Sequence, residues 1–342
     1  MARPETQRGA DLSALTTFRL PARAERLVEL KHVDQLAEID PGPARLVLGG
    51  GSNTIFFSDW AGVVLINRLR GLDVERIDEQ YSRVRVAAGE NWHRLVRWCL
   101  DRDLHGLENL ALIPGSVGAA PMQNIGAYGT ELAEVIESVS AWDWQTRERV
   151  EIPAAECEFG YRSSRFKARD RDRFLITAVT LRLAHRFRPN TRYRSLAEEL
   201  HKRYGTEPPQ PRQLAASVMR LRRHRLPNPT RLANAGSFFQ NPVVSAEQAA
   251  DLLDTHPELP HWPMPDNTCK LAACWLIEQL GWKGRAIGDA AVHKNHALVL
   301  VNRGRATASQ LDQLIRAIST NVETTYGVRL QPEPVLIGRS GP

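Results

Sequence analysis

The sequence predicts an α+β protein that contains more than one domain. Its 342 residues are 42% apolar and 25% charged, an ordinary globular composition in a chain long enough for two or three cores. Alternating apolar residues predict strands over 135–144 and 174–183, and helical spacing follows Asn91, the expected N-cap of a helix over 92–100. Strands and helices that share the chain in this way favour the α+β class.

The N-terminal part is expected to contribute one helix and several strands. An extended segment begins over 17–20, and apolar residues over 24–38 recur with loosely helical spacing. Short apolar runs over 46–48 and 62–68 predict strands, and the alternating residues from Val84 predict another.

The composition changes after Pro189, where the chain becomes polar, basic and bounded by prolines, and this predicts a domain boundary near Gln210. The elements predicted beyond it are a helix over 213–224, a helix capped by Ser245 with Gln248, helices over 270–279 and 310–320, and strands over 296–302 and 328–338.

Charge and targeting signals restrict the partners. The formal net charge is +6, but lysines and arginines are scattered, which gives weak support for phosphate-bearing ligands and little for nucleic acid. We expect a cytoplasmic protein without a membrane partner, because no signal-peptide core and no apolar run of about 18 residues occurs. The four cysteines lack C-x-x-C and zinc spacing, so we expect reduced packing residues and no metal site.

Two glycine-rich stretches are candidate ligand sites. LGGGSN (48–53) follows a short strand, and such a backbone can turn its N–H groups toward an anion. The alternative is a tight turn, since neither nucleotide-binding glycine motif is present. IPGSVGAAPMQNIGAYG (113–129) has four glycines and no charged residue, and it predicts a loop that packs against something large and flat. A buried connection between two sheets is the alternative.

Three further motifs present polar side chains near turns. Tyr161 and Arg162 stand in FGYRSS, where an arginine can simply be solvated. NAGSFFQNP presents the hydroxyl of Ser237 at a tight bend. Glu333 lies between two prolines, where a carboxylate could also protect an edge strand.

The chain carries six motifs in this order: LGGGSN (48–53), IPGSVGAAPMQNIGAYGTEL (113–132), FGYRSS (159–164), NAGSFFQNP (234–242), AVHKNHALVLVN (291–302) and LQPEP (330–334). In order and spacing they resemble the UDP-N-acetylenolpyruvoylglucosamine reductase family, over nearly the whole chain. Tyr193, in a segment of its own, is similar to the Tyr-bearing loop of the longer (type I) form.

The resemblance implies a two-lobed FAD-binding domain of the PCMH/vanillyl-alcohol-oxidase type and a C-terminal α+β substrate-binding domain. Its expected parts are a first lobe over 1–70, a second lobe over 71–212 and a substrate domain over 213–334, with the strand over 335–342 returning to the first lobe. The implied reaction is NADPH-dependent reduction of UDP-N-acetylenolpyruvoylglucosamine to UDP-N-acetylmuramate through non-covalently bound FAD, in cytoplasmic peptidoglycan precursor synthesis. We expect a monomer.

The resemblance assigns FAD contacts to both glycine-rich stretches. The first would hold the pyrophosphate through backbone N–H groups, and the second would pack along the isoalloxazine and ribityl chain. The implied cofactor-binding residues are Gly49, Gly50, Gly51, Ser52, Asn53, Ile113, Pro114, Gly115, Ser116, Gly118, Asn124, Gly126, Ala127 and Tyr128.

Family matching assigns the chemistry to Arg162, Ser237 and Glu333. Hydride addition to the enol ether builds negative charge on the adjacent carbon and its carboxylate, so a cation and a proton donor are needed. Arg162 would pair with the carboxylate, Ser237 would donate the proton, and Glu333 would orient or activate that machinery.

The implied substrate-binding residues are Tyr161, Tyr193, Arg225, Asn241, Trp262, Lys270 and His296. Two of them depart from the familiar family pattern. Arg225 stands where a lysine is familiar, so a bidentate fork replaces a point charge. His296 stands where a glutamine is familiar, and imidazole keeps one of the amide's hydrogen bonds but not all.

Two alternatives remain open on the sequence. One is a flavin oxidase of the same cofactor-binding fold that acts on another small substrate. The other is a nucleotide-binding regulatory protein that has lost its flavin.

Overall fold

The computed structural model describes residues 4–339, which form two compact units. The first unit comprises the chain up to Ala10, Ala24–Gly50 and Ala61–His224, and the second comprises Asp11–Arg23, Gly51–Trp60 and the chain from Arg225 onward. This division does not test the domain boundaries predicted at residues 70 and 212, which stay predictions. None of the described helices is long and apolar enough to cross a membrane.

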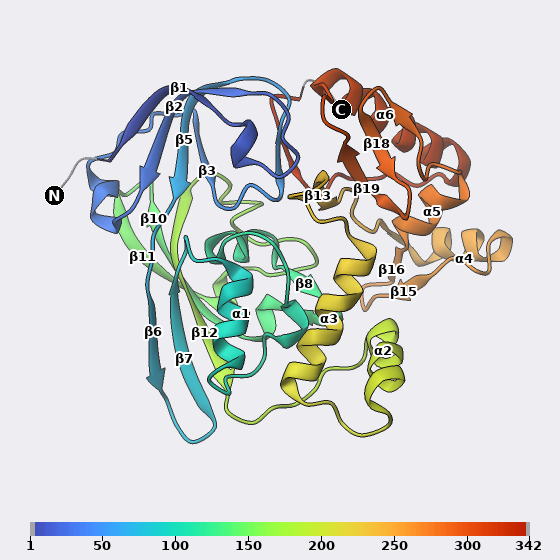
Figure 1. The fold of residues 1–342 in the computed structure, drawn as a ribbon, viewed down its shortest axis with the longest axis horizontal. Coiled ribbons are helices and arrows are strands. Elements are labelled where there is room, and N and C mark those ends of the chain that lie inside the picture. Colours follow the sequence, from blue (N-terminus) through green and yellow to red (C-terminus); the bar gives the residue numbers. More distant parts are fainter. Residues whose placement is uncertain (1–3, 340–342) are drawn as a thin grey trace. The chain divides into compact units, whose positions relative to one another are not determined.

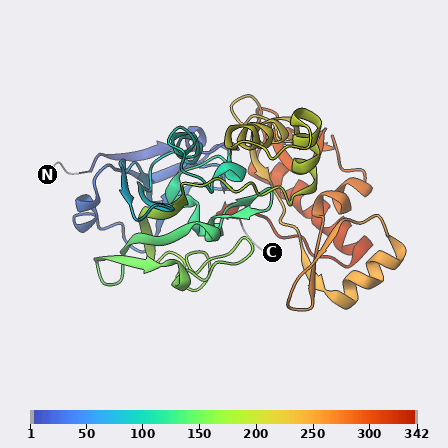
Figure 2. The same cartoon turned by 90° about the horizontal axis from the view of Figure 1, so that it is seen from below.

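The first unit contains two main sheets. One has the strand order β1-β2-β5-β3, and the other, antiparallel throughout, has the order β11-β10-β12-β7-β6 (Figure 1; Figure 2 gives the view turned by 90°). Val63 and Leu65 of β5 share a buried apolar cluster with Trp142 of β10 and Leu175 of β12, so the two sheets pack together. The strands are β1 (Thr6–Asp11), β2 (Arg23–Leu30), β3 (Arg45–Leu48), β5 (Trp60–Asn67), β6 (Leu72–Arg76), β7 (Tyr81–Ala87), β10 (Ile136–Asp143), β11 (Glu148–Pro153) and β12 (Phe174–Ala184).

Three helices and one small hairpin complete this unit: α1 (Trp92–Leu100), α2 (Arg194–Tyr204), α3 (Pro211–Arg225), β8 (Gly126–Ala127) and β9 (Thr130–Glu131). Asn91 caps α1 as predicted, since its side chain accepts the Arg94 N–H at 3.0 Å. The helix buries Trp92, Leu95 and Val96, which confirms the predicted apolar face.

The second unit is also α+β. Its larger sheet has the order β13-β19-β18-β17, a smaller one has the order β14-β16-β15, and β20 pairs in parallel with β4. The elements are β4 (Thr54–Phe56), β13 (Ala233–Ser237), β14 (Val243–Ser245), α4 (Ala246–Thr255), β15 (His261–Pro263), β16 (Thr268–Leu271), α5 (Ala273–Gln279), β17 (Ala286–Ile287), β18 (Ala290–His293), β19 (His296–Asn302), α6 (Ala308–Tyr326) and β20 (Val335–Ile337). Ser245 caps α4 by accepting the Gln248 N–H at 3.1 Å, but the predicted capping box is incomplete, because the Gln248 side chain donates to the Gly327 carbonyl at 3.0 Å.

The pairing of β20 with β4 brings Val335 opposite Thr54, so the C-terminal strand returns to a segment within the predicted first lobe. The strand predicted over 328–338 is too long: only β20 is a strand, and the segment before it contains Pro332 and Pro334, which have no backbone N–H to pair. Residues 340–342, the end of the strand predicted over 335–342, lie outside the described residues.

Several element predictions need correction. The helix predicted over 24–38 is wrong: the segment forms β2 and a 3₁₀ turn over Val33–Ala37, because Ala24, Val28 and Leu30 point into the core at strand spacing. The segment over 17–20 is a bend and not an extended strand. The helix predicted from residue 270 starts only at Ala273, because the residues before it belong to β16. The sequence reading also missed α2.

All four cysteines are free thiols, as predicted, and three of them are buried. Burial raises the pKa of Cys99 and that of Cys157 to about 12. These two thiols therefore act as packing groups at neutral pH.

Candidate active site

The two glycine-rich stretches contact each other within the first unit. A Cβ atom added to Gly50 would lie 2.8 Å from the Cα atom of Gly115, and one added to Gly49 would overlap the Ser116 hydroxyl. A real Cβ atom cannot lie that close to backbone, so glycine is required where the loops cross. The structure shows that Gly49 and Gly50 allow the other loop to come close. The cofactor contacts predicted for these glycines stay a prediction.

Unpaired backbone donors lie at this loop contact. The N–H groups of Gly49, Gly50, Gly115 and Ser116 donate to no other described residue. Gly50 is exposed and Gly49 and Gly115 are half-buried, so these donors are open to a ligand, and neighbouring unpaired N–H groups of this kind are typical of anion-binding loops. The residues present therefore fit the pyrophosphate of the predicted FAD.

The remainder of the long loop is held on the second sheet and α1. Gly118 donates its N–H to the Ala88 carbonyl at 2.8 Å, and an added Cβ would overlap the Ala88 side chain. The Gly115 carbonyl accepts the Trp92 N–H at 3.1 Å, at the first residue of α1. Ile113 and Pro114 lead into this contact. The loop is thus fixed at its glycines, which favours a preformed site.

The other three residues of the predicted cradle belong to the second unit. Gly51 has φ +61°, and its carbonyl accepts the Thr17 N–H at 3.0 Å. Asn53 donates its side-chain amide to the Glu333 carbonyl at 3.3 Å and accepts the Val335 N–H at 2.9 Å. Gly51 and Asn53 therefore hold the second unit together. Cofactor contacts for them, and for Ser52 between them, stay a prediction.

Tyr161 and Arg162 form the tip of a two-residue turn. Gly160 and Ser163 on either side exchange backbone hydrogen bonds of 3.1 and 3.2 Å. Arg162 has φ +52°, a left-handed conformation that costs free energy in a residue other than glycine and is often found at functional sites. Its Nη2 donates to the carbonyl of Gly126 at 3.2 Å, so the guanidinium lies against β8 of the long loop.

Two buried polar side chains fasten this turn to the long loop. Asn124, 1% exposed, donates its amide to the Gly160 carbonyl at 3.2 Å and accepts the Ala133 N–H at 2.9 Å. Ser164, also 1% exposed, donates to the Met122 carbonyl at 2.7 Å. These contacts of Asn124 position the Arg162 turn, and the cofactor contact predicted for Asn124 stays a prediction. Ser164 was not singled out, although it lies in the FGYRSS motif.

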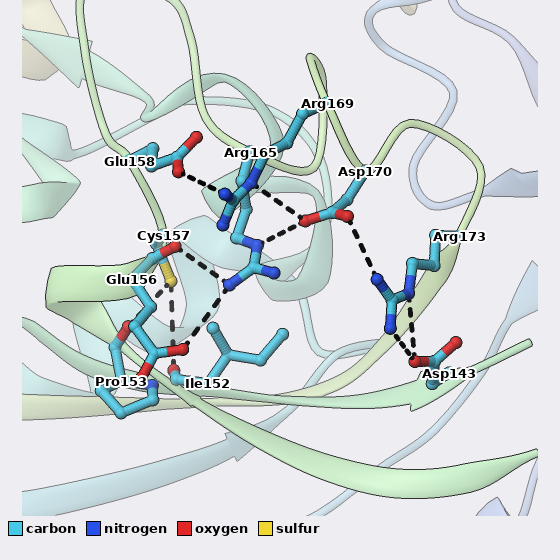
Figure 3. A network of polar contacts seen from close by, with 10 residues as sticks. All are labelled: Asp143, Ile152, Pro153, Glu156, Cys157, Glu158, Arg165, Arg169, Asp170 and Arg173. Carbon is cyan, nitrogen blue, oxygen red and sulfur yellow. Dashed lines mark hydrogen bonds and ion pairs between the residues drawn. The ribbon is translucent and has the colours of Figure 1, made fainter. Parts of the chain in front are cut away.

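A charge network anchors the chain that leaves the turn and enters β12 (Figure 3). Asp170, only 9% exposed, accepts from Arg165 Nε at 2.6 Å and lies 3.5 Å from Arg173 Nη1. Arg173 Nη2 in turn donates to Asp143 at 2.7 Å. Burial would raise the pKa of Asp143, but the hydrogen bonds from Arg173 and nearby backbone outweigh it and lower the pKa. The network holds the turn rigid from its far side.

Tyr193 packs on the end of the long loop. Its ring lies edge-on to the ring of Tyr128, with centroids 5.2 Å apart. Asn190 donates its side-chain amide to the Gly129 carbonyl at 2.8 Å, and Asn109 bridges the carbonyls of Tyr128 and Asn190 at 2.8 and 2.9 Å. The predicted substrate residue Tyr193 and the predicted cofactor residue Tyr128 therefore share one contact. Sequence reasoning missed both asparagines, since only the fold brings them together.

In the second unit, Ser237 and Glu333 lie on adjacent antiparallel segments. The Glu333 N–H donates to the Phe238 carbonyl at 2.7 Å, and Phe239 forms an antiparallel bridge with Pro332. Gly236 has φ +74°, which turns β13 sharply before Ser237. The Ser237 hydroxyl is half-buried and has no hydrogen-bond partner among the described residues. It is free to bond a ligand.

Three predicted substrate residues meet around the smaller sheet. Lys270 of β16 and Trp262 of β15 are cross-strand partners, and Lys270 Nζ lies 5.6 Å from the centroid of the indole ring. Asn241 accepts the Ala273 N–H at 3.1 Å and so fixes the start of α5. Trp262 is 42% exposed, unusual for so large an apolar side chain. A cation beside an exposed aromatic ring suits an anionic ligand with a flat group.

His296 is neutral at pH 7. Burial lowers its pKa to about 4, helped by the positive charge of Arg225 and by His293. Its Nδ1 accepts the Leu298 N–H at 3.3 Å, which leaves Nε2–H as the donor. Within residues 4–339 no group of three or more His, Cys, Asp or Glu could hold a metal ion.

Comparison with known proteins identifies the family of this chain. Residues 228–337 match the C-terminal domain of UDP-N-acetylenolpyruvoylglucosamine reductase, and residues 23–148 match an FAD binding domain. The chain is 48% identical over 335 residues to UDP-N-acetylenolpyruvoylglucosamine reductase of Paraburkholderia phytofirmans, covering 96% of this chain and 97% of that protein. The reductase of the same name from Burkholderia orbicola (strain MC0-3) is 46% identical and covers 95% of both chains. The chain belongs to the UDP-N-acetylenolpyruvoylglucosamine reductase family.

Solved structures agree with this family assignment. The UDP-N-acetylenolpyruvylglucosamine reductase from Thermus caldophilus superimposes with a TM-score of 0.66 at 25% identity, over 98% of this chain and all of that one. A solvent-stable cholesterol oxidase, at 10% identity and a TM-score of 0.51, shares the fold alone. The predicted fold class is confirmed, with a PCMH-type FAD-binding domain joined to a C-terminal α+β domain. This member of the reductase family is an FAD-binding oxidoreductase.

For this reductase-family chain, the structure gathers the predicted site residues into two sets. The first unit holds Gly49, Gly50, Ile113, Pro114, Gly115, Ser116, Gly118, Asn124, Gly126, Ala127, Tyr128, Tyr161, Arg162 and Tyr193. The second holds Gly51, Ser52, Asn53, Arg225, Ser237, Asn241, Trp262, Lys270, His296 and Glu333. The individual roles stay predictions.

Proposed function

We propose that the chain reduces UDP-N-acetylenolpyruvoylglucosamine to UDP-N-acetylmuramate with NADPH and bound FAD, as a cytoplasmic monomer in peptidoglycan precursor synthesis. The observation that carries the proposal is 48% identity, over 96% of the chain, to an enzyme named for this substrate. The alignment takes in both the cofactor region and the C-terminal domain. The proposal therefore covers both half-reactions, the reduction of the flavin by NADPH and the reduction of the enolpyruvyl sugar by the flavin.

The crossed glycine loops hold the cofactor in this proposal. The negative charge of the pyrophosphate is bound by the free backbone N–H groups of Gly49, Gly50, Gly115 and Ser116, so no charged side chain is needed there. FAD bound there would supply the hydride chemistry that carries reducing equivalents from NADPH to the terminal vinyl carbon of the substrate. The loop from Ile113 to Gly129 carries no charged residue, so it offers a neutral surface to the flavin ring.

Ser237 delivers the proton that completes the reduction. Its hydroxyl donates to the carbon that bears the ether oxygen, and its lack of a partner among the described residues leaves the O–H available. Serine is a weak acid in water, so the developing carbanion must be much more basic than the resulting alkoxide. Glu333, fixed beside Phe238 by its own backbone, supports that proton transfer by orienting the hydroxyl.

Cationic side chains stabilise the anionic substrate. Arg162, held in its strained turn, pairs with the enolpyruvyl carboxylate and offsets charge that grows during hydride addition. Arg225 and Lys270 bind the diphosphate, and a guanidinium can bind it in bidentate fashion. Tyr161, Tyr193, Asn241, Trp262 and His296 complete the substrate contacts.

The proposal is tested on the purified protein. We expect flavin absorbance bands, bleaching of these bands by NADPH without oxygen, and rapid return of the bands on addition of UDP-N-acetylenolpyruvoylglucosamine. UDP-N-acetylglucosamine, which lacks the enolpyruvyl group, serves as the control and must leave the flavin reduced. Reoxidation by oxygen alone, with no response to the enolpyruvyl sugar, would contradict the proposal and indicate an oxidase.

A further inference from the structure

A cavity of about 790 Å³ opens between α2 and α3 of the first unit, the two helices drawn in yellow-green and yellow in Figure 1. This volume is within the usual range for small-molecule sites. Its lining residues all come from the two helices and include none of the predicted active-site residues: Glu199, Lys202, Arg203, Tyr204, Ala216, Ser217, Arg220, Leu221, Arg223 and His224.

The lining is strongly basic. Four lysine and arginine side chains face a single carboxylate, that of Glu199, which pairs with Arg203 at 2.6 Å and with Arg220 at 3.2 Å. Lys202 and Arg223 form no ion pair with any residue of the described chain. Two cations therefore remain uncompensated, and a ligand with two negative charges would balance them.

A buried hydroxyl adds a second, independent indication of a ligand. Ser217 is 1% exposed and lines the cavity, and its Oγ has no hydrogen-bond partner within residues 4–339. Burying a hydroxyl without a partner costs free energy, so such groups are normally satisfied by protein, water or ligand. Because this oxygen is itself buried, a ligand in the cavity bonds it only after the Ser217 side chain turns toward the cavity.

Apolar groups form the rest of the lining. Tyr204, Leu221 and Ala216 supply an aromatic ring and aliphatic carbon beside the basic side chains. A ligand that is wholly inorganic would leave this surface uncovered. A flat ring joined to phosphate groups fits both parts of the lining, since the ring can stack on Tyr204 while the phosphates reach the cations.

We propose that the cavity between α2 and α3 is a second ligand site that binds a nucleoside diphosphate. The diphosphate bonds Lys202 and Arg223, the base packs against Tyr204 and Leu221, and the Ser217 hydroxyl receives a hydrogen-bond partner. The site is independent of the reductase chemistry, because it shares no residue with the groups assigned to cofactor or substrate.

The test measures ADP binding to the FAD-loaded protein by calorimetry, with adenosine as the phosphate-free probe. The double variant Lys202→Ala/Arg223→Ala should weaken ADP binding at least about 10-fold, because each charged hydrogen bond to phosphate is lost. The matched control Arg194→Ala/Arg212→Ala removes one cation from each of the same helices outside the cavity, and should stay within about twofold of wild type.

Retained flavin and unchanged melting temperature establish that the double variant is folded. The proposal is overturned if that folded variant binds ADP as wild type does, or if adenosine binds as tightly as ADP. Wild-type binding should also weaken when ionic strength rises, because exposed cations are screened.

Discussion

The candidate cofactor region of the first unit and the candidate catalytic region of the second are built by opposite means. In the first, Gly49 and Gly50 pack on Gly115 and Ser116, and backbone N–H groups are the unpaired donors. In the second, Ser237 presents a side chain from a bent strand. The difference teaches which changes each region tolerates: any added Cβ disrupts the first, whereas a truncated side chain in the second can leave the fold intact.

The largest effect on cofactor binding is expected for Gly50→Val. The added Cβ would lie 2.8 Å from the Gly115 Cα, so the loops must separate, and we expect little bound flavin and a loss of stability of roughly 1–3 kcal/mol. Flavin absorbance per protein and a thermal melt measure both effects. Gly160→Ala is the control, because its Cβ would meet only Ser163 Cβ at 3.9 Å. Wild-type flavin content in Gly50→Val would show that the loop crossing is not the cofactor site.

An effect on stability that is seen only when the pH is lowered is expected for His296→Gln. The folded-state pKa of about 4 lies below the ordinary 6.5, so the unfolded chain binds the proton first. This stability contribution is complete above pH 6.5 and is lost as pH falls toward 4. Between pH 7 and 4.5, wild type should therefore lose about 2–3 kcal/mol more than His296→Gln, which does not titrate. Denaturant melts at both pH values check this. Equal losses would mean that His296 is not buried as a neutral group.

The smallest effect is expected for Tyr193→Phe. This variant tests whether a side chain of the first unit can also be truncated without disturbing the fold. Its ring contact with Tyr128 is kept, and only the phenolic hydroxyl is lost. We expect KM for the nucleotide-sugar to rise about 3- to 10-fold, as for one lost hydrogen bond, with the rate of flavin reduction by NADPH unchanged. An unchanged KM would remove this hydroxyl from the substrate site.

The sequence predicted elements whose signals are local. Asn91 as a cap and the face of Trp92, Leu95 and Val96 indicate α1 without any tertiary information. It failed for α2, which buries only Leu196 and Leu200 and is otherwise polar, with support from the i,i+4 pair of Arg194 and Glu198. Composition there indicates a linker as readily as a helix.

The site shows the same limit. The six motifs located the glycine loops and Ser237, but not the reason for the glycines, because Gly50 and Gly115 are distant in sequence and meet only in the fold. The buried contacts of Asn124 and Ser164 that hold the Arg162 turn were equally invisible. A sequence motif identifies residues, whereas the structural role of each residue depends on the contacts that it makes in the fold.

The most direct test of the account is a stopped-flow comparison of Ser237→Ala with wild type, following flavin absorbance through both half-reactions. If Ser237 only donates the proton, the variant should bind flavin normally and be reduced by NADPH at a rate near that of wild type. Its reoxidation by UDP-N-acetylenolpyruvoylglucosamine should fall by ~10² to 10⁴, the usual cost of removing a positioned general acid. Ser237→Cys should recover part of this loss, because a thiol can donate a proton. Rapid reoxidation of the alanine variant by the sugar would contradict the account, and would leave Ser237 as a residue that only shapes the bend after Gly236.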